Sequence, residues 1–241
     1  MHFLVSIDDT DNLDSPGTGE VAQWLREHLE CMKLAKTTFI TRHQLFIHPD
    51  IAYTSHNSSM CFIAEAIAPL NTIIPVMASK IREFSSHDSD PGLCIASLDS
   101  LQHPEELIAF GKAAKTEVLN KDMAYALALK TGAHLSEHGG DGSGVIGALA
   151  GAGLRLSGED GKLRGSLSFS QTLISVSKIR IHPDIQDIRT LSHETITDDE
   201  LVEIVDKPKT VMQEGKAVLL LTHCEASRNW RTLTRKELKN Y

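Results

Sequence analysis

Hydrophobic residues along the first half of the chain occur in two alternating patterns. Short continuous apolar runs predict buried strands at residues 3–7, 37–41, 60–67 and 93–98. Between them, apolar residues three or four positions apart predict helices at residues 72–84, 105–119 and 121–130, the last two separated at Asn120. This alternation favours a mixed α/β or α+β fold, and the element order of residues 58–130 predicts a ferredoxin-like module.

The first predicted strand is followed by an acidic loop and then by a helix. Ser15 is the predicted N-cap, and Pro16 suits the first helical position. Apolar residues then follow at helical spacing, namely Val21, Leu25, Leu29 and Met32. The N-terminal order is therefore strand, acidic loop, helix.

The second half of the chain has weaker patterns. A glycine-rich loop at residues 138–144 precedes a predicted helix of small residues at 145–154. Farther on, we predict a hairpin at residues 162–176, a helix at 198–205 and an apolar strand at 217–222. The pentapeptide IHPDI occurs at residues 47–51 and 181–185, and chance explains it better than duplication because the flanking residues do not align.

Composition narrows the class of protein. The chain has 241 residues, of which 41% are hydrophobic and 23% charged, enough for one large domain or two closely associated ones. Its start lacks the pattern of a signal peptide, and no apolar run is long enough to span a bilayer, so we expect a cytoplasmic protein. The four cysteines form no CxxC pair, so we expect buried thiols rather than a zinc ribbon or a redox site.

The charge of the chain bears on nucleic-acid binding. A formal net charge of −8 argues against generic binding, which needs clustered Lys and Arg. Residues 228–239 are the exception, because they are rich in Lys and Arg, with Trp230 available to stack on a base. A solvated terminal helix or strand explains this tail equally well.

The acidic loop is the strongest candidate for chemistry. Asp8, Asp9, Asp11 and Asp14 lie within seven residues, and carboxylates at this density repel one another unless a cation is bound. Magnesium takes one or two carboxylates, with waters and phosphate oxygens completing its coordination, so Asp8, Asp9 and Asp11 suffice for one ion. The alternative is that these aspartates, with Asn12, only cap turns.

A phosphate site is predicted next to the acidic loop. Gly17, Thr18 and Gly19 lie in the first turn of the predicted helix, where backbone N–H groups and the helix dipole favour an anion. The two glycines would leave the Thr18 hydroxyl accessible as a phosphate acceptor. The alternative is an ordinary polar residue in a first helical turn.

The second glycine loop offers another backbone cradle for phosphate. It is a poor dinucleotide fingerprint because no strand is predicted before it, and a Walker A loop is excluded because Val145 and Ile146 replace the required Lys and Ser or Thr. The candidate ligand-binding residues here are Gly140, Gly142, Ser143 and Gly144. His56 and Asn57, in a polar stretch, are further candidates as hydrogen-bond donors to a phosphate or base. The alternative for the glycine loop is a flexible connection, and the alternative for the polar stretch is an ordinary loop.

Three separated sequence blocks, in their order along the chain, resemble blocks of the archaeal tRNA-isoleucine agmatidine synthetase family. SIDDTDNLDSPGTG resembles the family's GIDDTDSP-type loop, LFIHPDIAYTSHNSSMC its RLNPNIPWKTRGNGA-type block, and SGVIGALAGAGLRL its RGLIGALAAIGA block. The resemblance covers about residues 1–170.

The resemblance implies a kinase-like synthetase catalytic domain with an inserted ferredoxin-like domain, the use of ATP and Mg²⁺, and a phosphorylatable threonine, which is Thr18 by position. It assigns residues 1–57 and 131–241 to the catalytic domain with its C-terminal extension, and 58–130 to the ferredoxin-like domain. Two family arginines are replaced here by Ser143 and His56. The family's OB-fold and zinc ribbon, which hold tRNA, have no counterpart in this sequence, so agmatinylation of tRNA is not inferred.

These patterns together predict an ATP- and Mg²⁺-dependent phosphotransferase or synthetase-like enzyme. A small-molecule acceptor suits the acidic composition, whereas RNA would need the basic tail or a partner protein. One alternative is a non-catalytic nucleotide-sensing or assembly module, favoured by the missing arginines. The other is an aspartate-based phosphohydrolase using Asp9 and Asp11, although Leu13 stands where such enzymes usually have Thr or Val.

Overall fold

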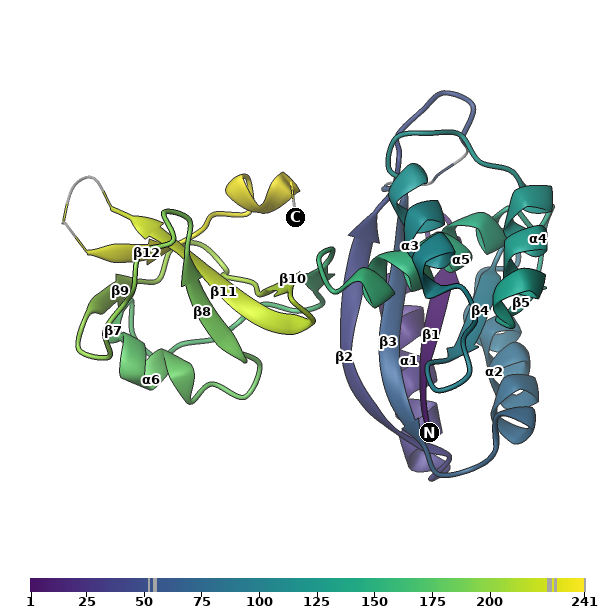
Figure 1. The fold of residues 1–241 in the computed structure, drawn as a ribbon, viewed down its shortest axis with the longest axis horizontal. Helices are drawn as coiled ribbons and strands as arrows, with labels where there is room; N and C mark the ends of the chain where they lie inside the picture. The colour runs from purple at the N-terminus through teal and green to yellow at the C-terminus, as the bar shows by residue number, and fades with distance from the viewer. Residues whose placement is uncertain (52, 54–55, 225–226, 228, 241) are drawn as a thin grey trace. The chain divides into compact units, whose positions relative to one another are not determined.

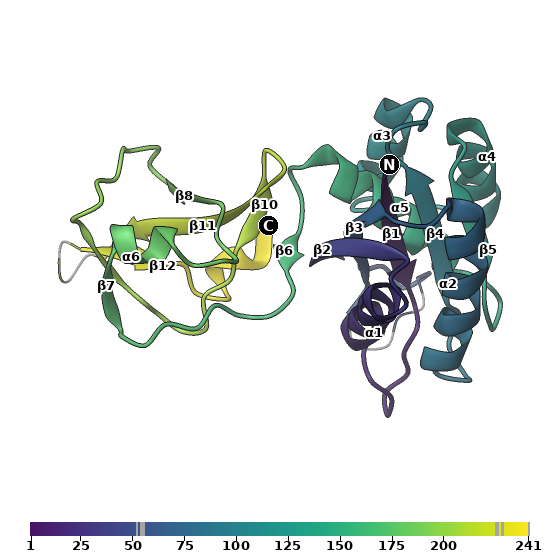
Figure 2. The same cartoon turned by 90° about the horizontal axis from the view of Figure 1, so that it is seen from below.

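The structure is a computed structural model that describes residues 1–51, 53, 56–224, 227 and 229–240. Contacts divide the chain into two compact units, Met1–Ser157 and Gly158–Tyr241, which Figures 1 and 2 show from two sides. Both helices and strands are abundant, so the predicted mixed α/β class is confirmed. In the described part of the chain, no helix has the length and apolar character needed to cross a bilayer.

The first unit is built on one antiparallel sheet with β1 at its centre. Its strands are β1 (His2–Asp8), β2 (Ala35–Gln44), β3 (Ser58–Ala66), β4 (Gly92–Ser97) and β5 (His134–Glu137). They are ordered β5-β4-β1-β3-β2, and each neighbouring pair is antiparallel. The central position of β1 places the residues that follow it between segments from both sides of the sheet.

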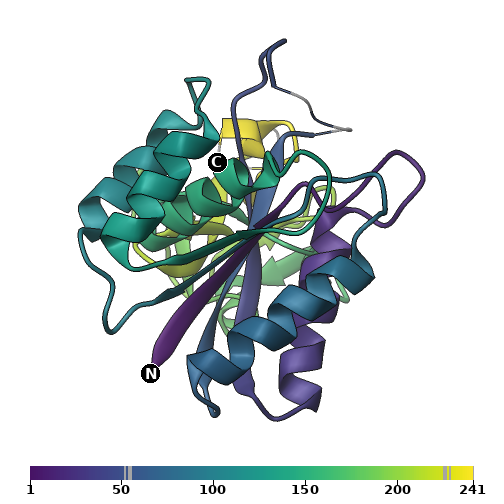
Figure 3. The same cartoon turned by 90° about the vertical axis from the view of Figure 1, so that its right-hand side faces the viewer.

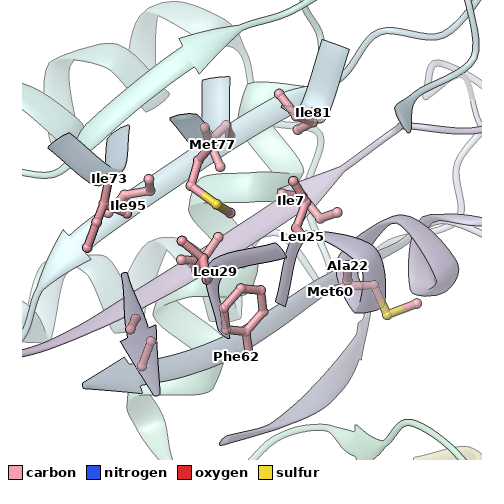
Figure 4. Close-up of a cluster of buried hydrophobic side chains, with 14 of the residues drawn as sticks. Ile7, Ala22, Leu25, Leu29, Met60, Phe62, Ile73, Met77, Ile81 and Ile95 are labelled. Atoms are coloured by element: carbon pink, nitrogen blue, oxygen red, sulfur yellow. The ribbon is translucent and has the colours of Figure 1, made fainter. Parts of the chain in front are cut away.

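Helices cover both faces of this sheet (Figure 3). The helices are α1 (Thr18–Cys31), α2 (Leu70–Phe84), α3 (Pro104–Ala113), α4 (Lys121–Thr131) and α5 (Gly144–Ser157). Alternate residues of each strand point to opposite faces, and Ile7 of β1 packs with Leu25 and Leu29 of α1 and Met77 of α2 (Figure 4). Leu4 points to the other face, which α3, α4 and α5 cover.

The ferredoxin-like element order lies earlier in the chain than predicted. The order β-α-β-β-α-β is that of residues 2–97, whose four strands are adjacent in the sheet. Residues 58–130 form no sheet of their own, because β3 pairs with β1 and β2, and β4 pairs with β1 and β5. Whether the predicted ranges separate a catalytic from a ferredoxin-like domain stays a prediction.

The second unit consists mainly of short strands around β11. Its elements are β6 (Lys162–Leu163), β7 (Leu173–Ser175), α6 (Val176–Arg180), β8 (Asp187–Thr190), β9 (Leu201–Glu203), β10 (Val211–Gln213), β11 (Lys216–His223), β12 (Trp230–Thr232) and the 3₁₀ helix η1 (Glu237–Asn240). Strand β11 pairs antiparallel with β10 and β12 and parallel with β8. The predicted strand at residues 217–222 is therefore confirmed as the centre of this unit.

Several local predictions were wrong. Residues 162–176 form no hairpin, because β6 pairs with β10 and β7 with β9. Residues 198–205 contain strand β9 rather than a helix, because Val202 is buried and its strand is hydrogen-bonded to β7 and β12. Helix α1 begins at Thr18, and the Ser15 hydroxyl accepts a hydrogen bond from the Asn12 amide instead of capping the helix. A strand, β5, precedes the second glycine loop where none was predicted.

The structure also corrects two predictions about single side chains. Trp230 is 4% exposed, stacks on His223 and donates its Nε1–H to Glu200 at 3.0 Å, so it is not available to stack on a base. Cys61 and Cys94 are buried as expected, whereas Cys31 is exposed. The burial of Trp230 was not predicted, because a single aromatic residue in a basic segment does not show whether it belongs to a buried strand.

The repeated IHPDI pentapeptide adopts the same turn in both units. The isoleucine amide donates to the carbonyl of His48 at 3.0 Å in one copy and of His182 at 3.1 Å in the other. The aspartate amide donates to the Nδ1 of the same histidine, at 3.3 and 3.2 Å. The pentapeptide therefore encodes a local turn, and no duplication is needed to explain it.

Candidate functional site

A cavity of about 230 Å³ lies beside the carboxyl end of β1, within the first unit. Its walls come from the acidic loop, the start of α1, the segment before β3, the segment between α3 and α4, and the start of α5. Its lining residues are Asp8, Asp9, Asp11, Thr18, Leu45, Asp50, Ile51, Tyr53, His56, Asn57, Ser58, Ala114, Glu117, Val118, Leu119, Asp141, Ser143, Gly144, Ile146 and Gly147. Eight of the residues predicted from sequence thus line one cavity.

Asp8 is the last residue of β1 and is buried against α5. A Cβ atom at Gly147 would lie 1.6 Å from Asp8 Oδ2, so only glycine at that position leaves room for the carboxyl group. Burial raises the pKa of Asp8 well above its usual value, and the negative charges of Asp9 and Asp11 raise it further. The carboxylate form of Asp8 therefore needs a nearby cation.

Asp9 has a left-handed backbone, with φ of 53°, which aspartate tolerates better than most residues. Its carbonyl accepts a hydrogen bond from the Asp90 amide at 3.1 Å, which ties the acidic loop to the segment before β4. Burial raises the pKa of Asp9 to about 6, with further contributions from Asp90, Asp11 and Asp141. Asp9 thus lies in a cluster of like charges assembled from three separate loops.

Asp11 holds Thr18 at the start of α1. Asp11 Oδ1 accepts hydrogen bonds from the Thr18 amide at 3.2 Å and from the Thr18 hydroxyl at 2.5 Å. The Thr18 backbone N–H, which was predicted from the sequence as a donor to phosphate, is thus hydrogen-bonded to a carboxylate. The same contact places a proton acceptor on the Thr18 hydroxyl, which is the arrangement that activates a nucleophile.

The predicted glycines near α1 do not line the cavity. Gly17 is the N-cap residue, with an extended backbone, and Gly19 is buried within the first turn of the helix. Thr18, between them, is 7% exposed and reaches the cavity. The glycines therefore shape the helix start, and phosphate binding by them stays a prediction.

The second glycine loop reaches the cavity through its last residues. Ser143 and Gly144 line the cavity, whereas Gly140 and Gly142 do not. These two glycines have positive φ angles of 53° and 76°, so they provide turns that other residues rarely adopt. Helix α5 begins at Gly144 and directs its first turn toward the acidic loop.

His56 and Asn57 both line the cavity, and their role as hydrogen-bond donors stays a prediction. Its Nδ2 donates to the Phe46 carbonyl at 2.6 Å. A carbonyl only accepts hydrogen bonds, so this contact identifies the amide nitrogen. The second N–H of Nδ2 can still donate to a ligand, and Oδ1 can accept.

Sequence reasoning missed four further acids at this site. Asp50, Asp141 and Glu117 line the cavity, and Asp90 contacts Asp9 electrostatically. Asp90 precedes β4, and the antiparallel register that pairs Asp8 with Gly92 brings it to the end of β1. For Asp90, that register was the missing signal, because sequence reasoning did not pair β4 with β1.

The donor set suits a hard cation bound partly through water and phosphate. Magnesium prefers carboxylate oxygens and keeps several non-protein ligands. Within the described residues, the one group of three His, Asp or Glu ligand atoms lying within 4.8 Å of one another is His103, Glu105 and Glu106, on the surface at the start of α3. The acidic loop does not form such a closed cluster, and metal binding by Asp8, Asp9 and Asp11 stays a prediction.

The chain was also compared with known proteins. No family model and no curated protein matches the sequence. Its fold is similar to apo TiaS, a tRNA agmatidine synthetase, at 25% identity and a TM-score of 0.55, over 64% of this chain and 35% of that chain. The complex of TiaS with its isoleucine tRNA and ATP gives 27% identity and a TM-score of 0.56, over 64% and 36%.

A third structure, the complex of TiaS with the same tRNA, AMPCPP and agmatine, matches in fold over 88% of this chain and 52% of that chain, at 20% identity and a TM-score of 0.55. The resemblance inferred from the three sequence blocks is therefore confirmed. The chain spans about a third of the length of the first two structures.

Proposed function

We propose that the first unit binds ATP with Mg²⁺ and acts as the catalytic part of an ATP-dependent phosphotransferase or synthetase. One observation carries this proposal. The acidic loop, the Thr18 hydroxyl and the start of α5 meet in one cavity, in a unit whose chain resembles TiaS in fold. Phosphoryl transfer needs mainly positioning and charge neutralisation, which a metal ion and helix starts supply together.

The charge of the cavity makes nucleotide binding depend on metal. Six carboxylic acids and no Lys or Arg are among the described residues that line it. A triphosphate would be repelled here, so binding requires a divalent ion held by Asp8, Asp9 or Asp11. When bound, the ion would neutralise phosphate charge.

Thr18 is the proposed phosphate acceptor. Its hydroxyl donates to Asp11 Oδ1 at 2.5 Å, so Asp11 can take the proton as the threonine oxygen attacks the terminal phosphorus of ATP. A phosphothreonine forms, and ADP leaves with the bridging oxygen. Because Thr18 lines the cavity at a helix start, the dipole of α1 would stabilise the added charge.

The final acceptor is a separate question. The TiaS structures hold an isoleucine tRNA with ATP, or with AMPCPP and agmatine. For this chain we propose a small-molecule acceptor, or an RNA bound with the help of the C-terminal tail or a partner. Within that tail, Arg231 is already held by Glu237 through two hydrogen bonds of 2.9 and 2.7 Å, and Arg228 lies outside the described residues.

A non-catalytic nucleotide-sensing module is the second candidate. It is favoured by the absence of Lys and Arg among the described lining residues. Such a protein would bind nucleotide through the same metal but would not transfer phosphate.

Incubation with γ-labelled ATP and Mg²⁺ tests these proposals. We expect label on the protein that Thr18→Ala abolishes and Thr18→Ser retains, and Asp11→Asn should slow labelling because it removes the proton acceptor. Thr72→Ala, at an exposed threonine of α2, is the matched control and should label normally. Metal-dependent binding without label or hydrolysis would favour the sensor. No nucleotide binding by the unaltered protein would refute both.

A further inference from the structure

The cavity needs a positive charge beyond its metal ion. ATP carries about four negative charges near neutral pH, and one divalent ion neutralises half of them. The acids around the cavity add to the repulsion. Proteins that transfer phosphate commonly add Arg or Lys to the metal, yet none lies among the described lining residues.

Arg42, on β2, is a half-buried cation one hydrogen bond away from the cavity. Its Nε donates to Ser58 Oγ at 3.0 Å, and its NH2 group lies 3.5 Å from Gln44 Oε1. Both partners are neutral, and no carboxylate of the described residues pairs with it. Burial lowers the pKa of Arg42, and no neighbouring acid offsets this effect. Partial burial costs a guanidinium some of its solvation, and none of the described carboxylates compensates Arg42 for that loss.

Ser58 connects Arg42 to the cavity. It is 7% exposed and lines the cavity wall. Because the arginine N–H occupies a lone pair of Ser58 Oγ, the hydroxyl proton of Ser58 remains to be donated to another acceptor. In the described part of the protein this proton has no acceptor. A hydroxyl polarised by a cation is a stronger donor than a neutral one.

We propose that Arg42, acting through the Ser58 hydroxyl, is a positioning residue for a phosphate group in this cavity. The proposal rests on the proposed nucleotide function. The anion would supply a counter-charge to Arg42, and Ser58 would donate the hydrogen bond.

A purely structural role for Arg42 gives different expectations. Ser58 and Gln44 are directly paired between β3 and β2, and Arg42 contacts both side chains. If Arg42 only held this strand pair together, its loss would lower stability and would weaken all ligands equally. A phosphate-directed role weakens the ligands that carry the contacted phosphate and leaves adenosine unaffected.

Calorimetric binding of adenosine, MgAMP, MgADP and MgATP to the full chain separates the two roles. We expect Arg42→Gln and Ser58→Ala each to weaken MgATP about 10- to 100-fold and to leave adenosine nearly unchanged. The double variant should be no weaker than Arg42→Gln, because both changes remove one interaction. Arg26→Gln is the control: Arg26 donates to the Thr38 carbonyl outside the cavity, so MgATP affinity should be unaltered.

Equal weakening of adenosine and MgATP, or additive effects in the double variant, would overturn the role of Arg42. Thermal melting without ligand identifies a folding defect in Arg42→Gln, in which case Ser58→Ala alone decides. If the unaltered protein binds MgATP and Ser58→Ala binds it equally well, only this inference fails. If the unaltered protein binds no nucleotide, the proposed function fails with it.

Discussion

Gly147→Ala adds a single methyl group at the point where α5 touches the acidic loop. The new Cβ would lie 1.6 Å from Asp8 Oδ2 and 2.5 Å from Asp8 Cγ, well inside van der Waals contact. The carboxyl group of Asp8 must therefore turn away, or α5 must move outward. The first movement displaces a predicted metal ligand and the second removes the helix that packs on it, and neither changes any charge.

Two opposing terms set the effect on stability. Alanine is about 1 kcal/mol more favourable than glycine in a helix interior. Overpacking a well-filled region costs about 1–3 kcal/mol. The net destabilisation should be about 0–2 kcal/mol, which lowers Tm by no more than a few degrees in a chain of this size. Loss of one charged ligand contact costs about 1.5–3 kcal/mol, so MgATP affinity should fall about 10- to 100-fold.

Gly151→Ala is the matched control, one turn farther along the same face of α5. Its Cβ would lie 2.2 Å from Ser59 Oγ and 2.6 Å from Ser6 Oγ, so it crowds hydroxyl groups instead of a carboxylate. Thermal melting and MgATP titration of both variants give the comparison. We expect both to melt at lower temperature and only Gly147→Ala to lose nucleotide affinity. The reasoning is refuted if Gly147→Ala binds MgATP normally or if both variants lose affinity equally.

Three other changes follow from buried groups. The folded-state pKa of Asp9 is raised from 3.8 to about 6, so between these pH values the unfolded chain has lost the Asp9 proton while the folded chain keeps it. The stability of the fold should therefore decrease as pH rises from about 4 to about 6. Asp9→Asn should flatten this decrease in metal-free melting curves. Trp230→Ala should cost about 3–5 kcal/mol in urea unfolding, because it empties a buried site in the second unit, and a loss below about 1 kcal/mol would contradict its burial. A thiol reagent should label Cys31 in the native protein but Cys61 and Cys94 only after denaturation, and native labelling of either buried thiol would show that the sheet opens.

Strong local patterns predicted most of the first unit. The apolar runs located β1, β3 and β4, and Asn120 is indeed the N-cap of α4, with its side chain accepting from the Met123 amide at 3.0 Å. Strand pairing could not be read in this way, because antiparallel partners lie far apart in the chain. The β-α-β-β-α-β order is found at residues 2–97, and the predicted domain ranges stay a prediction. In the second unit the strands are only two to eight residues long, too short for a clear period.

The candidate site was predictable where its residues are adjacent in sequence. The acidic loop was found because crowded carboxylates repel one another, and Thr18 because it lies in the first turn of a predicted helix. Asp90 and Asp141 were missed because nothing in the sequence indicates that their loops meet the acidic loop. Arg42 was missed for a different reason: a cation on a strand is ordinary, and only its burial beside neutral partners makes it unusual. Such a signal exists only in three dimensions.

Small residues of α5 are what make the acidic loop a site instead of a solvated turn. A Cβ at Gly144 would lie 2.2 Å from the Asp90 carbonyl, and one at Gly147 would overlap the Asp8 carboxyl group, so these glycines allow the helix to approach the strand ends closely. That approach buries Asp8 and raises its pKa, which is unfavourable for an isolated carboxylate. A cation beside Asp8 would replace the lost solvation. In the proposed function, these glycines would therefore act by bringing the acids into position for a metal ion.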